Sequence, residues 1–231
     1  MQDLIKQEQF EIEVLDRLNT KRFLNNLVFS GGTMMRLCWG LDRFSVDLDF
    51  WVTKEIDFRI LYNDYKKELS EYYRISDSAN KFKTILFELK SPDYPRSLKI
   101  EIRKEPKKIK SVSAIAYSKH SNIQVMLKTV SLEDMMKAKI QAFLSRKEIR
   151  DIYDIEFLFK RGIPIEAEKE NLRAILDGID KLTKNDYSVK LGSLLEMNQR
   201  KYYSEKNFII LKRQIYSMLN EGTQMTQIKI I

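Results

Sequence analysis

Apolar residues recur along the first half of the chain with two different spacings. Helical spacing over residues 2–19 and 57–73 predicts two amphipathic helices. Two-residue alternation or short apolar runs predict strands between and after these helices. The predicted strands cover residues 24–30, the segment around Leu48, and residues 82–90, 97–104, 112–117 and 123–130. The pattern therefore predicts a mixed sheet with helices packed against it.

From residue 131 onward the pattern is almost entirely helical. Residues 131–160 predict two consecutive helices, and Pro164 predicts the start of another after the stop at Arg161-Gly162. The last ten residues, 222–231, are expected to form a weakly ordered or edge-packed tail. We thus expect an α/β (α+β) chain with a sheet-containing subdomain over residues 1–130 and a helical subdomain over residues 131–231.

The segment of residues 31–50 combines two features that bear on chemistry. Gly31-Gly32-Thr33 opens a predicted helix, where backbone N–H groups and the positive helix end can hold phosphate. Asp47 and Asp49 alternate on an apolar strand, so both carboxylates leave the same face, roughly 6–7 Å apart along the backbone. Such a pair suits magnesium, which prefers oxygen ligands and often bridges to substrate phosphates. The combination predicts phosphoryl or nucleotidyl transfer.

Each feature has an ordinary structural explanation when it stands alone. An Asp-x-Asp pair arises by chance in a chain of this length, and a Gly-Gly pair is most often a plain turn. However, the two aspartates flank Leu48 and precede Phe50, in a segment that predicts a buried central strand. Burying carboxylates there is costly unless a cation or metal compensates, which favours a functional role.

A family resemblance rests on these residues. The matching run consists of Gly31-Gly32-Thr33, Arg36-Leu37, Arg43-Phe44-Ser45 and Asp47-Leu48-Asp49-Phe50. It resembles the opening motif of the AbiEii/AbiGii toxin branch of the nucleotidyltransferase superfamily, whose members have a DNA polymerase beta-like fold. The resemblance implies a nucleotidyltransferase fold followed by a helical subdomain that completes the active site.

A third carboxylate follows on a later predicted strand. Residues 97–103 alternate cleanly, with Lys99, Glu101 and Arg103 on one face. Considered alone, Glu101 is an ordinary solvent-facing strand residue. In the family a Lys-x-Asp-Ile motif supplies a carboxylate to the metals, and Lys99-Ile100-Glu101-Ile102 resembles it with Glu in place of Asp. The resemblance implies that Glu101 is a metal ligand or the general base for the attacking hydroxyl.

Two predicted helices carry the remaining motif. Lys139 and Arg146 lie seven residues apart and share a helix face, and on periodicity alone the pair of helices is an ordinary amphipathic hairpin. The pattern nevertheless matches a family motif at Lys139, Ala142, Arg146, Arg150, Asp151 and Asp154. The resemblance implies that Lys139 stabilises charge on the triphosphate and that Asp151 orients a basic residue or the nucleotide. The sequence leaves open which of Asp151 and Asp154 matters more.

The resemblance thus implies a full set of site residues. The implied catalytic residues are Asp47, Asp49, Glu101, Lys139 and Asp151. The implied nucleotide-binding residues are Gly31, Gly32, Thr33, Arg36, Lys139, Arg146 and Arg150. Asp47, Asp49 and Glu101 are the expected ligands of two magnesium ions, with manganese as an alternative, and a nucleoside triphosphate is the expected substrate.

Composition narrows the functional classes. The 231-residue chain has a net charge of +8 and a pI near 9.3, which suits a polyanionic partner. The single cysteine, Cys38, excludes a disulfide framework and fits a reducing cytoplasm. The single histidine, His120, is expected to be exposed, and it excludes a His-rich metal site and disfavours a Ser-His-Asp triad. We expect no signal peptide, and no apolar run is long enough to cross a bilayer.

The expected reaction moves a nucleoside monophosphate from a triphosphate to a hydroxyl acceptor. The resemblance implies a cytoplasmic toxin of a toxin–antitoxin or abortive-infection system, with RNA (the 3′ end of transfer RNA) as acceptor and an antitoxin protein from a neighbouring gene as partner. Two alternatives stay open: the same chemistry on a protein or small-molecule hydroxyl, and a non-catalytic nucleic-acid-binding module.

Overall fold

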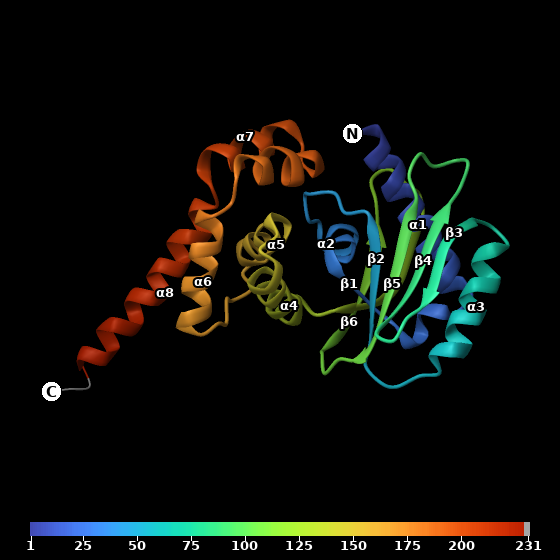
Figure 1. The fold of residues 1–231 in the computed structure, drawn as a ribbon, viewed down its shortest axis with the longest axis horizontal. Coiled ribbons are helices and arrows are strands. Elements are labelled where there is room, and N and C mark those ends of the chain that lie inside the picture. Colours follow the sequence, from blue (N-terminus) through green and yellow to red (C-terminus); the bar gives the residue numbers. More distant parts are fainter. Residues whose placement is uncertain (229–231) are drawn as a thin grey trace. The chain divides into compact units, whose positions relative to one another are not determined.

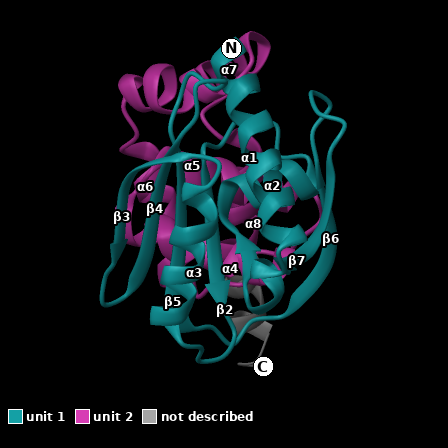
Figure 2. Ribbon diagram, turned by 90° about the vertical axis from the view of Figure 1, so that its right-hand side faces the viewer, with its two compact units in different colours: residues 1–131 teal, residues 132–231 magenta. Residues whose placement is uncertain are grey.

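The computed structural model describes the backbone of residues 1–228 and the side chains of residues 1–220. It divides into two compact units, unit 1 (Met1–Ser131) and unit 2 (Leu132–Ile231), which Figure 2 colours separately. The sheet belongs to unit 1, and the described part of unit 2 is helical (Figure 1).

Unit 1 is built around one mixed sheet. In chain order it comprises α1 (Gln2–Thr20), the 3₁₀ helix η1 (Phe23–Asn26), β1 (Val28–Ser30), α2 (Gly31–Trp39), β2 (Asp47–Val52), α3 (Phe58–Ser70), β3 (Arg74–Asn80), β4 (Thr84–Lys90), β5 (Leu98–Pro106), β6 (Ser111–Tyr117) and β7 (Gln124–Val130). The seven strands lie in the order β3-β4-β5-β2-β1-β7-β6. β2 is parallel to β5 and antiparallel to β1, while β1 is parallel to β7. The predicted mixed sheet is confirmed.

Alternation along the central strands gives the sheet two different faces. On β2, Leu48, Phe50 and Val52 are buried, whereas the intervening residues that begin with Asp47 are half-buried. The neighbouring β5 repeats the pattern in register, because Leu48 pairs with the buried Ile100. One face is therefore apolar core, and the opposite face carries the carboxylates.

Helices α1 and α3 cover the apolar face and appear in front of the sheet in Figure 2. Tyr65 of α3 is fully buried, and its ring stacks on Phe87 of β4 with centroids 6.0 Å apart. α1 contributes Phe10, Val14 and Leu18, which are also fully buried. Each large apolar side chain buried in this way stabilises the fold by about 1.5–3 kcal/mol. The predicted helices over residues 2–19 and 57–73 are confirmed.

Helix α2 follows β1 directly and ends in a glycine cap. Gly40 has a left-handed backbone (φ 74°), and the next N–H, that of Leu41, donates to the carbonyl of Met35 at 3.0 Å. Cys38 is half-buried on this helix and is a free thiol. Burial raises the pKa of that thiol to about 12.

Two strand predictions need correction. The predicted strand over residues 24–30 is shorter, because residues 23–26 form η1 and only Val28–Ser30 form β1. Strand β3 was not predicted at all. Its sequence, RISDSAN, lacks regular apolar alternation, and it occupies one edge of the sheet, where most of its side chains are exposed or half-buried. Pairing with β4 rather than an intrinsic pattern holds it in strand conformation.

Unit 2 is an assembly of helices. It comprises α4 (Leu132–Arg146), α5 (Ile149–Lys160), α6 (Lys169–Asp180), the π-helical turn η2 (Asp186–Leu191), the 3₁₀ turn η3 (Gly192–Leu194), α7 (Met197–Lys206) and α8 (Ile209–Ile228). Its core includes Phe143 of α4, Ile152 of α5 and Ile175 of α6, all fully buried. The two consecutive helices predicted over residues 131–160 are confirmed as α4 and α5.

The prediction that Pro164 opens a helix is wrong. Residues 163–168 form no regular secondary structure, and α6 begins at Lys169 after the extended Glu168. Proline fixes a φ that suits extended backbone as well as a first helical turn, and the apolar helical spacing resumes only at Leu172. In the predicted tail, α8 continues to Ile228, and residues 229–231 lie outside the described residues.

Candidate active site

Neither glycine of the Gly31-Gly32 turn has room for a side chain. Gly31 has a left-handed φ of 79°, and a Cβ there would lie 2.5 Å from Oδ2 of Asp49. A Cβ on Gly32 would lie 2.7 Å from Nη2 of Arg43 and 2.7 Å from Oγ of Ser45. The start of α2 is therefore pressed against the carboxylate of β2, and only glycine permits that approach.

Side chains of the same turn fasten α2 to β2. The hydroxyl of Thr33 donates to the carbonyl of Asp47 at 2.6 Å, and the hydroxyl of Ser30 donates to the carbonyl of Asp49 at 3.1 Å. Ser30 and Asp49 are also register partners in the β1–β2 ladder. The Thr33 hydroxyl is thus engaged with the backbone, which leaves the first-turn N–H groups of α2 as the donors for a phosphate.

The three predicted carboxylates lie on one face of adjacent strands. Asp47 and Asp49 are both half-buried on the same side of β2. On the parallel neighbour β5, Glu101 is the register partner of Asp49, so its side chain leaves the sheet on the same side. Side chains more than fifty positions apart in sequence are brought together in this way.

Lys99 is a member of this cluster that sequence reasoning did not include among the site residues. Its Nζ lies 3.0 Å from Oε2 of Glu101, and it is the register partner of Asp47. Burial lowers the pKa of Lys99, but the hydrogen bond to Glu101 and the charges of Glu101, Asp47 and Asp49 together raise it. The signal was present in the Lys-x-Glu spacing, where only the glutamate was given a role.

Arg43 is a second residue without a predicted role. It is buried, with 3% of its surface exposed, and its Nη1 donates to the carbonyl of Phe44 at 3.0 Å. Its Nη2 stands where a side chain on Gly32 would be. A buried guanidinium at this point supplies positive charge beside the start of α2. The available signal was the place of Arg43 in the run of residues that resembles the family motif, where it was given no role.

The donor set on this face fits a divalent metal ion. Asp47 and Asp49 supply carboxylate oxygens from one strand, and Glu101 supplies them from the next; such oxygens are the ligands that magnesium prefers. Among the described side chains, those of residues 1–220, no three of Asp, Glu, His or Cys are arranged as a metal site. At this face, Glu101 contacts two cations: its Oε2 lies 3.0 Å from Nζ of Lys99, and its Oε1 lies 3.7 Å from Nε of Arg103. Asp47 and Asp49 would hold the ion. Glu101 would become a third ligand once it no longer contacts Lys99 and Arg103.

Arg36 contacts protein groups in unit 1. Its guanidinium pairs with Glu8 of α1, donates to the carbonyl of Leu41 at 3.2 Å and lies 3.8 Å from the ring centroid of Phe44. These contacts join α1 to α2 next to the glycine turn. Its predicted nucleotide-binding role stays a prediction.

A fully buried acid lies close to the same contacts. Glu11 of α1 has no exposed surface, and neither of its carboxylate oxygens has a hydrogen-bond partner. Burial raises the pKa of Glu11 well above the ordinary range, with further increases from Glu8 and Asp47 and a lowering effect of Arg36. These effects favour the neutral, protonated form of the carboxyl.

In unit 2, the predicted charged residues form a compact ion-pair cluster. Lys139 of α4 is 8% exposed, and its Nζ lies 2.7 Å from Oδ2 of Asp154 and 3.4 Å from Oδ1 of Asp151. Arg146 binds Asp151 through two parallel contacts, Nε to Oδ2 at 2.6 Å and Nη2 to Oδ1 at 2.7 Å. Both aspartates are fully buried, whereas Arg150 is exposed.

This cluster gives both aspartates of α5 a partner. Asp151 orients two cations at once, and Asp154 makes the shorter contact with Lys139. The aspartates thus fix the position of the Lys139 ammonium group. The catalytic and nucleotide-binding roles predicted for Lys139, Arg146, Arg150 and Asp151 stay predictions.

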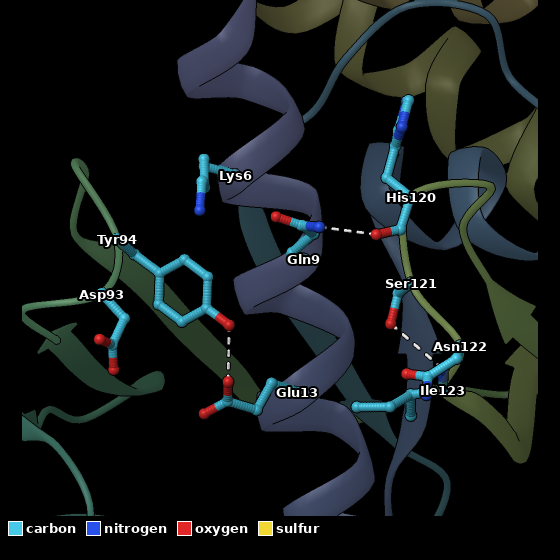
Figure 3. Close-up of a pocket in the computed structure, with 9 residues that line it drawn as sticks. All are labelled: Lys6, Gln9, Glu13, Asp93, Tyr94, His120, Ser121, Asn122 and Ile123. Atoms are coloured by element: carbon cyan, nitrogen blue, oxygen red, sulfur yellow. Dashed lines mark hydrogen bonds between the residues drawn. The ribbon is translucent and has the colours of Figure 1, made fainter.

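A separate pocket holds the single histidine (Figure 3). It has a volume of about 280 Å³ and lies between α1 and the loops before β5 and β7. His120 is half-buried, so the prediction that it is exposed is wrong; its carbonyl accepts a hydrogen bond from Gln9 at 2.6 Å. On the other side, the Tyr94 hydroxyl donates to Glu13 at 2.6 Å. None of the predicted site residues lines this pocket.

The described helices contain no segment that is long and apolar enough to span a membrane.

Comparison with known proteins agrees with the resemblance seen in the motifs. Residues 13–208 match the family model for "Nucleotidyl transferase AbiEii toxin, Type IV TA system". No curated protein sequence matches the chain.

Two solved structures from Helicobacter pylori are similar in fold. A candidate nucleotidyltransferase is 20% identical with a TM-score of 0.57, and the alignment covers 92% of this chain and 96% of that one. The protein JHP933 is 22% identical with a TM-score of 0.52, and the alignment covers 95% of this chain and 98% of that one. The family match spans most of the chain and includes the glycine turn, all three carboxylates and the Lys139 cluster. The chain belongs to the AbiEii family of nucleotidyltransferase toxins of type IV toxin–antitoxin systems.

Proposed function

We propose that the protein transfers a nucleoside monophosphate from a nucleoside triphosphate to the 3′ hydroxyl of an RNA acceptor, with magnesium as cofactor. One observation carries the proposal. Asp47, Asp49 and Glu101 share one sheet face, and the glycine turn that opens α2 touches the Asp49 carboxylate. A donor set for a divalent cation and a phosphate-binding helix end are thus adjacent.

In the proposed reaction, the acceptor oxygen attacks the α-phosphorus of the triphosphate. A new phosphorus–oxygen bond forms as the bond to the bridging oxygen breaks, and pyrophosphate leaves with the electron pair. Glu101 accepts the proton of the attacking hydroxyl once it is released from Lys99 and Arg103. Magnesium, when bound, neutralises charge on the phosphoryl oxygens.

The protein groups around α2 hold the leaving group. The first-turn N–H groups of α2 donate to the phosphates, and the positive helix end favours their charge. Arg43 adds a cation beside Gly32. The hydrogen bonds from Thr33 and Ser30 keep this helix end at a fixed distance from the carboxylates of β2.

RNA is the acceptor that the charge of the protein favours. The net charge of +8 attracts a polyanion, whereas a small neutral hydroxyl compound gains nothing from it. As a member of a type IV toxin–antitoxin family, the protein has an antitoxin counterpart. We propose that this counterpart is a protein encoded by a neighbouring gene.

The test is a labelling experiment. Purified protein is incubated with magnesium, total cellular RNA and each α-labelled nucleoside triphosphate in turn, with Asp47→Asn as the matched control. Label on RNA of transfer-RNA size, formed only by the wild type and lost on chelation of the metal, supports the proposal and names the nucleotide. Label on protein or on a small molecule would overturn the RNA acceptor. The absence of any label, together with tight RNA binding, would favour a non-catalytic binding module.

A further inference from the structure

A cavity opens beside Asp47 on the side of β2 away from the glycine turn. Its volume is about 390 Å³, and it lies among the start of β2, the start of β5 and the end of β4. The cavity wall includes the Asp47 side chain, so a molecule that fills it lies next to the proposed reaction centre.

The cavity wall carries two cations and a polar pair. Arg96, exposed in the loop before β5, and Lys99 supply positive charge. Glu88 of β4 is the register partner of Lys99 and accepts a hydrogen bond from the Ser97 hydroxyl at 2.6 Å. The wall thus offers a cation for a phosphate and a carboxylate oxygen for a sugar hydroxyl.

The position of the cavity relative to the glycine turn limits what can bind there. The turn adjoins Asp49 from the β1 side, whereas the cavity adjoins Asp47 from the β5 side. In a phosphoryl transfer the attacking and leaving oxygens stand roughly in line, on opposite sides of the phosphorus. If pyrophosphate leaves at the start of α2, the attacking hydroxyl therefore arrives from the side of the cavity.

The charge of the cavity wall also favours the polynucleotide acceptor over the nucleoside triphosphate. The two cations of the wall, Arg96 and Lys99, are balanced by the two carboxylates, Asp47 and Glu88, so the cavity suits the single charge of a phosphodiester better than the several charges of a triphosphate. Arg96 provides a cation for that phosphodiester at the cavity mouth.

We propose that this cavity binds the terminal sugar and phosphate of a polynucleotide acceptor, with Arg96 paired to the last phosphodiester and Glu88 accepting a hydrogen bond from a sugar hydroxyl. The inference rests on the proposed function for the identity of the acceptor. It adds a binding site and two specificity residues that the motifs of the family do not include.

The first test measures binding without turnover. A short, labelled single-stranded RNA with a free 3′ hydroxyl is titrated with protein, in the absence of nucleotide and magnesium, and followed by fluorescence anisotropy. Arg96→Ala should weaken binding about tenfold, and the slope of log Kd against log salt should fall by about 0.7, as expected for one lost phosphate contact. Arg96→Lys should restore most of the affinity. Arg59→Ala, an exposed arginine outside the cavity, is the matched control and should leave both values unchanged.

The second test assigns the contact to one phosphate. An RNA in which the last phosphodiester is a neutral methylphosphonate should bind the wild type about tenfold more weakly than normal RNA, and should bind Arg96→Ala no more weakly than normal RNA does. Glu88→Gln should reduce the preference for a ribose over a deoxyribose terminus. Equal sensitivity of the wild type and Arg96→Ala to the methylphosphonate would overturn the inference.

Transfer assays separate failure of this inference from failure of the proposed function. If the wild-type protein transfers no label to RNA, the proposed function is overturned, even if the binding results agree with the inference. If RNA is labelled, Arg96→Ala should raise the KM for RNA about tenfold and leave the KM for the nucleoside triphosphate unchanged. A raised KM for the triphosphate instead would place the nucleotide in the cavity and overturn the inference.

Discussion

In unit 1, Asp47 and Asp49 lie half-buried on one face of a sheet, whereas in unit 2 Asp151 and Asp154 are fully buried on a helix whose neighbour supplies their cations. The sequence resemblance covers all four, but it does not show how their surroundings compare. Their surroundings differ. The first pair adjoins a helix end and a cavity, and the second pair is fully buried, in contact with the buried Lys139 and paired with the exposed Arg146.

This difference predicts that the carboxylates of unit 1 take part in the reaction and that the aspartates of unit 2 stabilise the fold. A carboxylate that binds metal must be reachable, and it has to exchange its partners during turnover. A buried carboxylate held by cations fixes a geometry, and the removal of one partner leaves an uncompensated charge. Substitutions of Asp47 and Asp49 should therefore act mainly on activity, and those in the unit 2 cluster should act strongly on stability.

The largest expected effect is that of Asp47→Asn. The amide keeps the shape of the side chain but loses the charge that would hold magnesium, so transfer should fall by roughly a thousandfold, or about 4 kcal/mol in the barrier. The measurement is the rate of label transfer to RNA, with the melting temperature followed in parallel. Unfolding of the variant, or wild-type activity, would contradict the assignment of this residue to chemistry.

Asp154→Ala should produce the largest loss of stability. It removes the partner 2.7 Å from the buried Lys139 ammonium, so the free energy of unfolding should drop by about 3–5 kcal/mol. Chemical denaturation followed by circular dichroism measures this value. The matched control is Asp177→Ala, an exposed aspartate of the same unit, which should change it by less than about 0.5 kcal/mol. Similar losses in the free energy of unfolding for the two variants would contradict the prediction that the buried ion-pair cluster stabilises unit 2.

Two glycines with similar backbones allow a finer test. Gly31 and Gly162 both have left-handed φ angles, 79° and 83°, but a Cβ meets Asp49 at Gly31 and nothing within 4 Å at Gly162. Gly162→Ala should therefore cost only the backbone strain, about 1 kcal/mol of stability, with activity retained. Gly31→Ala should cost about 2 kcal/mol more and also reduce transfer, because the Asp49 carboxylate must move. Equal effects on activity would show that the close approach in unit 1 is unimportant.

The smallest expected effect concerns Glu11, a buried acid of unit 1 that lacks the partners of Asp151 and Asp154. The raised pKa means that the folded protein keeps the proton at pH values where the unfolded chain releases it. The free energy of unfolding should thus decrease as the pH rises above the ordinary glutamate range, and Glu11→Gln should remove this decrease.

At neutral pH, Glu11→Gln should raise the free energy of unfolding slightly, and the gain should vanish in acid, where both states carry the proton. Thermal unfolding at a series of pH values measures the effect. Glu71→Gln, an exposed glutamate of the same unit, serves as the control. A gain that is independent of pH would show that the carboxyl is already ionised in the folded protein.

Features that rest on a local pattern could be predicted from the sequence. The alternation around Leu48 and Ile100 predicts both central strands, and the glycine turn before the aspartates predicts where α2 begins. Strand β3 could not be predicted, because partner pairing rather than its own apolar pattern decides its conformation.

The rest of the site depends on contacts between residues that are far apart in the sequence, which a local pattern does not reveal. Arg36 pairs with Glu8, and Ser118 donates to the same carboxylate from more than a hundred residues away. Lys99 and Glu88 meet only because β4 and β5 pair in a particular register. The motif supplied candidate residues, and the three-dimensional pairing decides which neighbours each of them has.

The half-buried thiol of Cys38 has a practical consequence for experiments on this toxin. With a pKa of about 12, almost none of it is thiolate at neutral pH, so maleimide dyes should react with it very slowly. A cysteine introduced on the surface would therefore be the main point of attachment. One such cysteine in each unit would give a dye pair for energy-transfer measurements of the distance between the sheet and the helices during turnover.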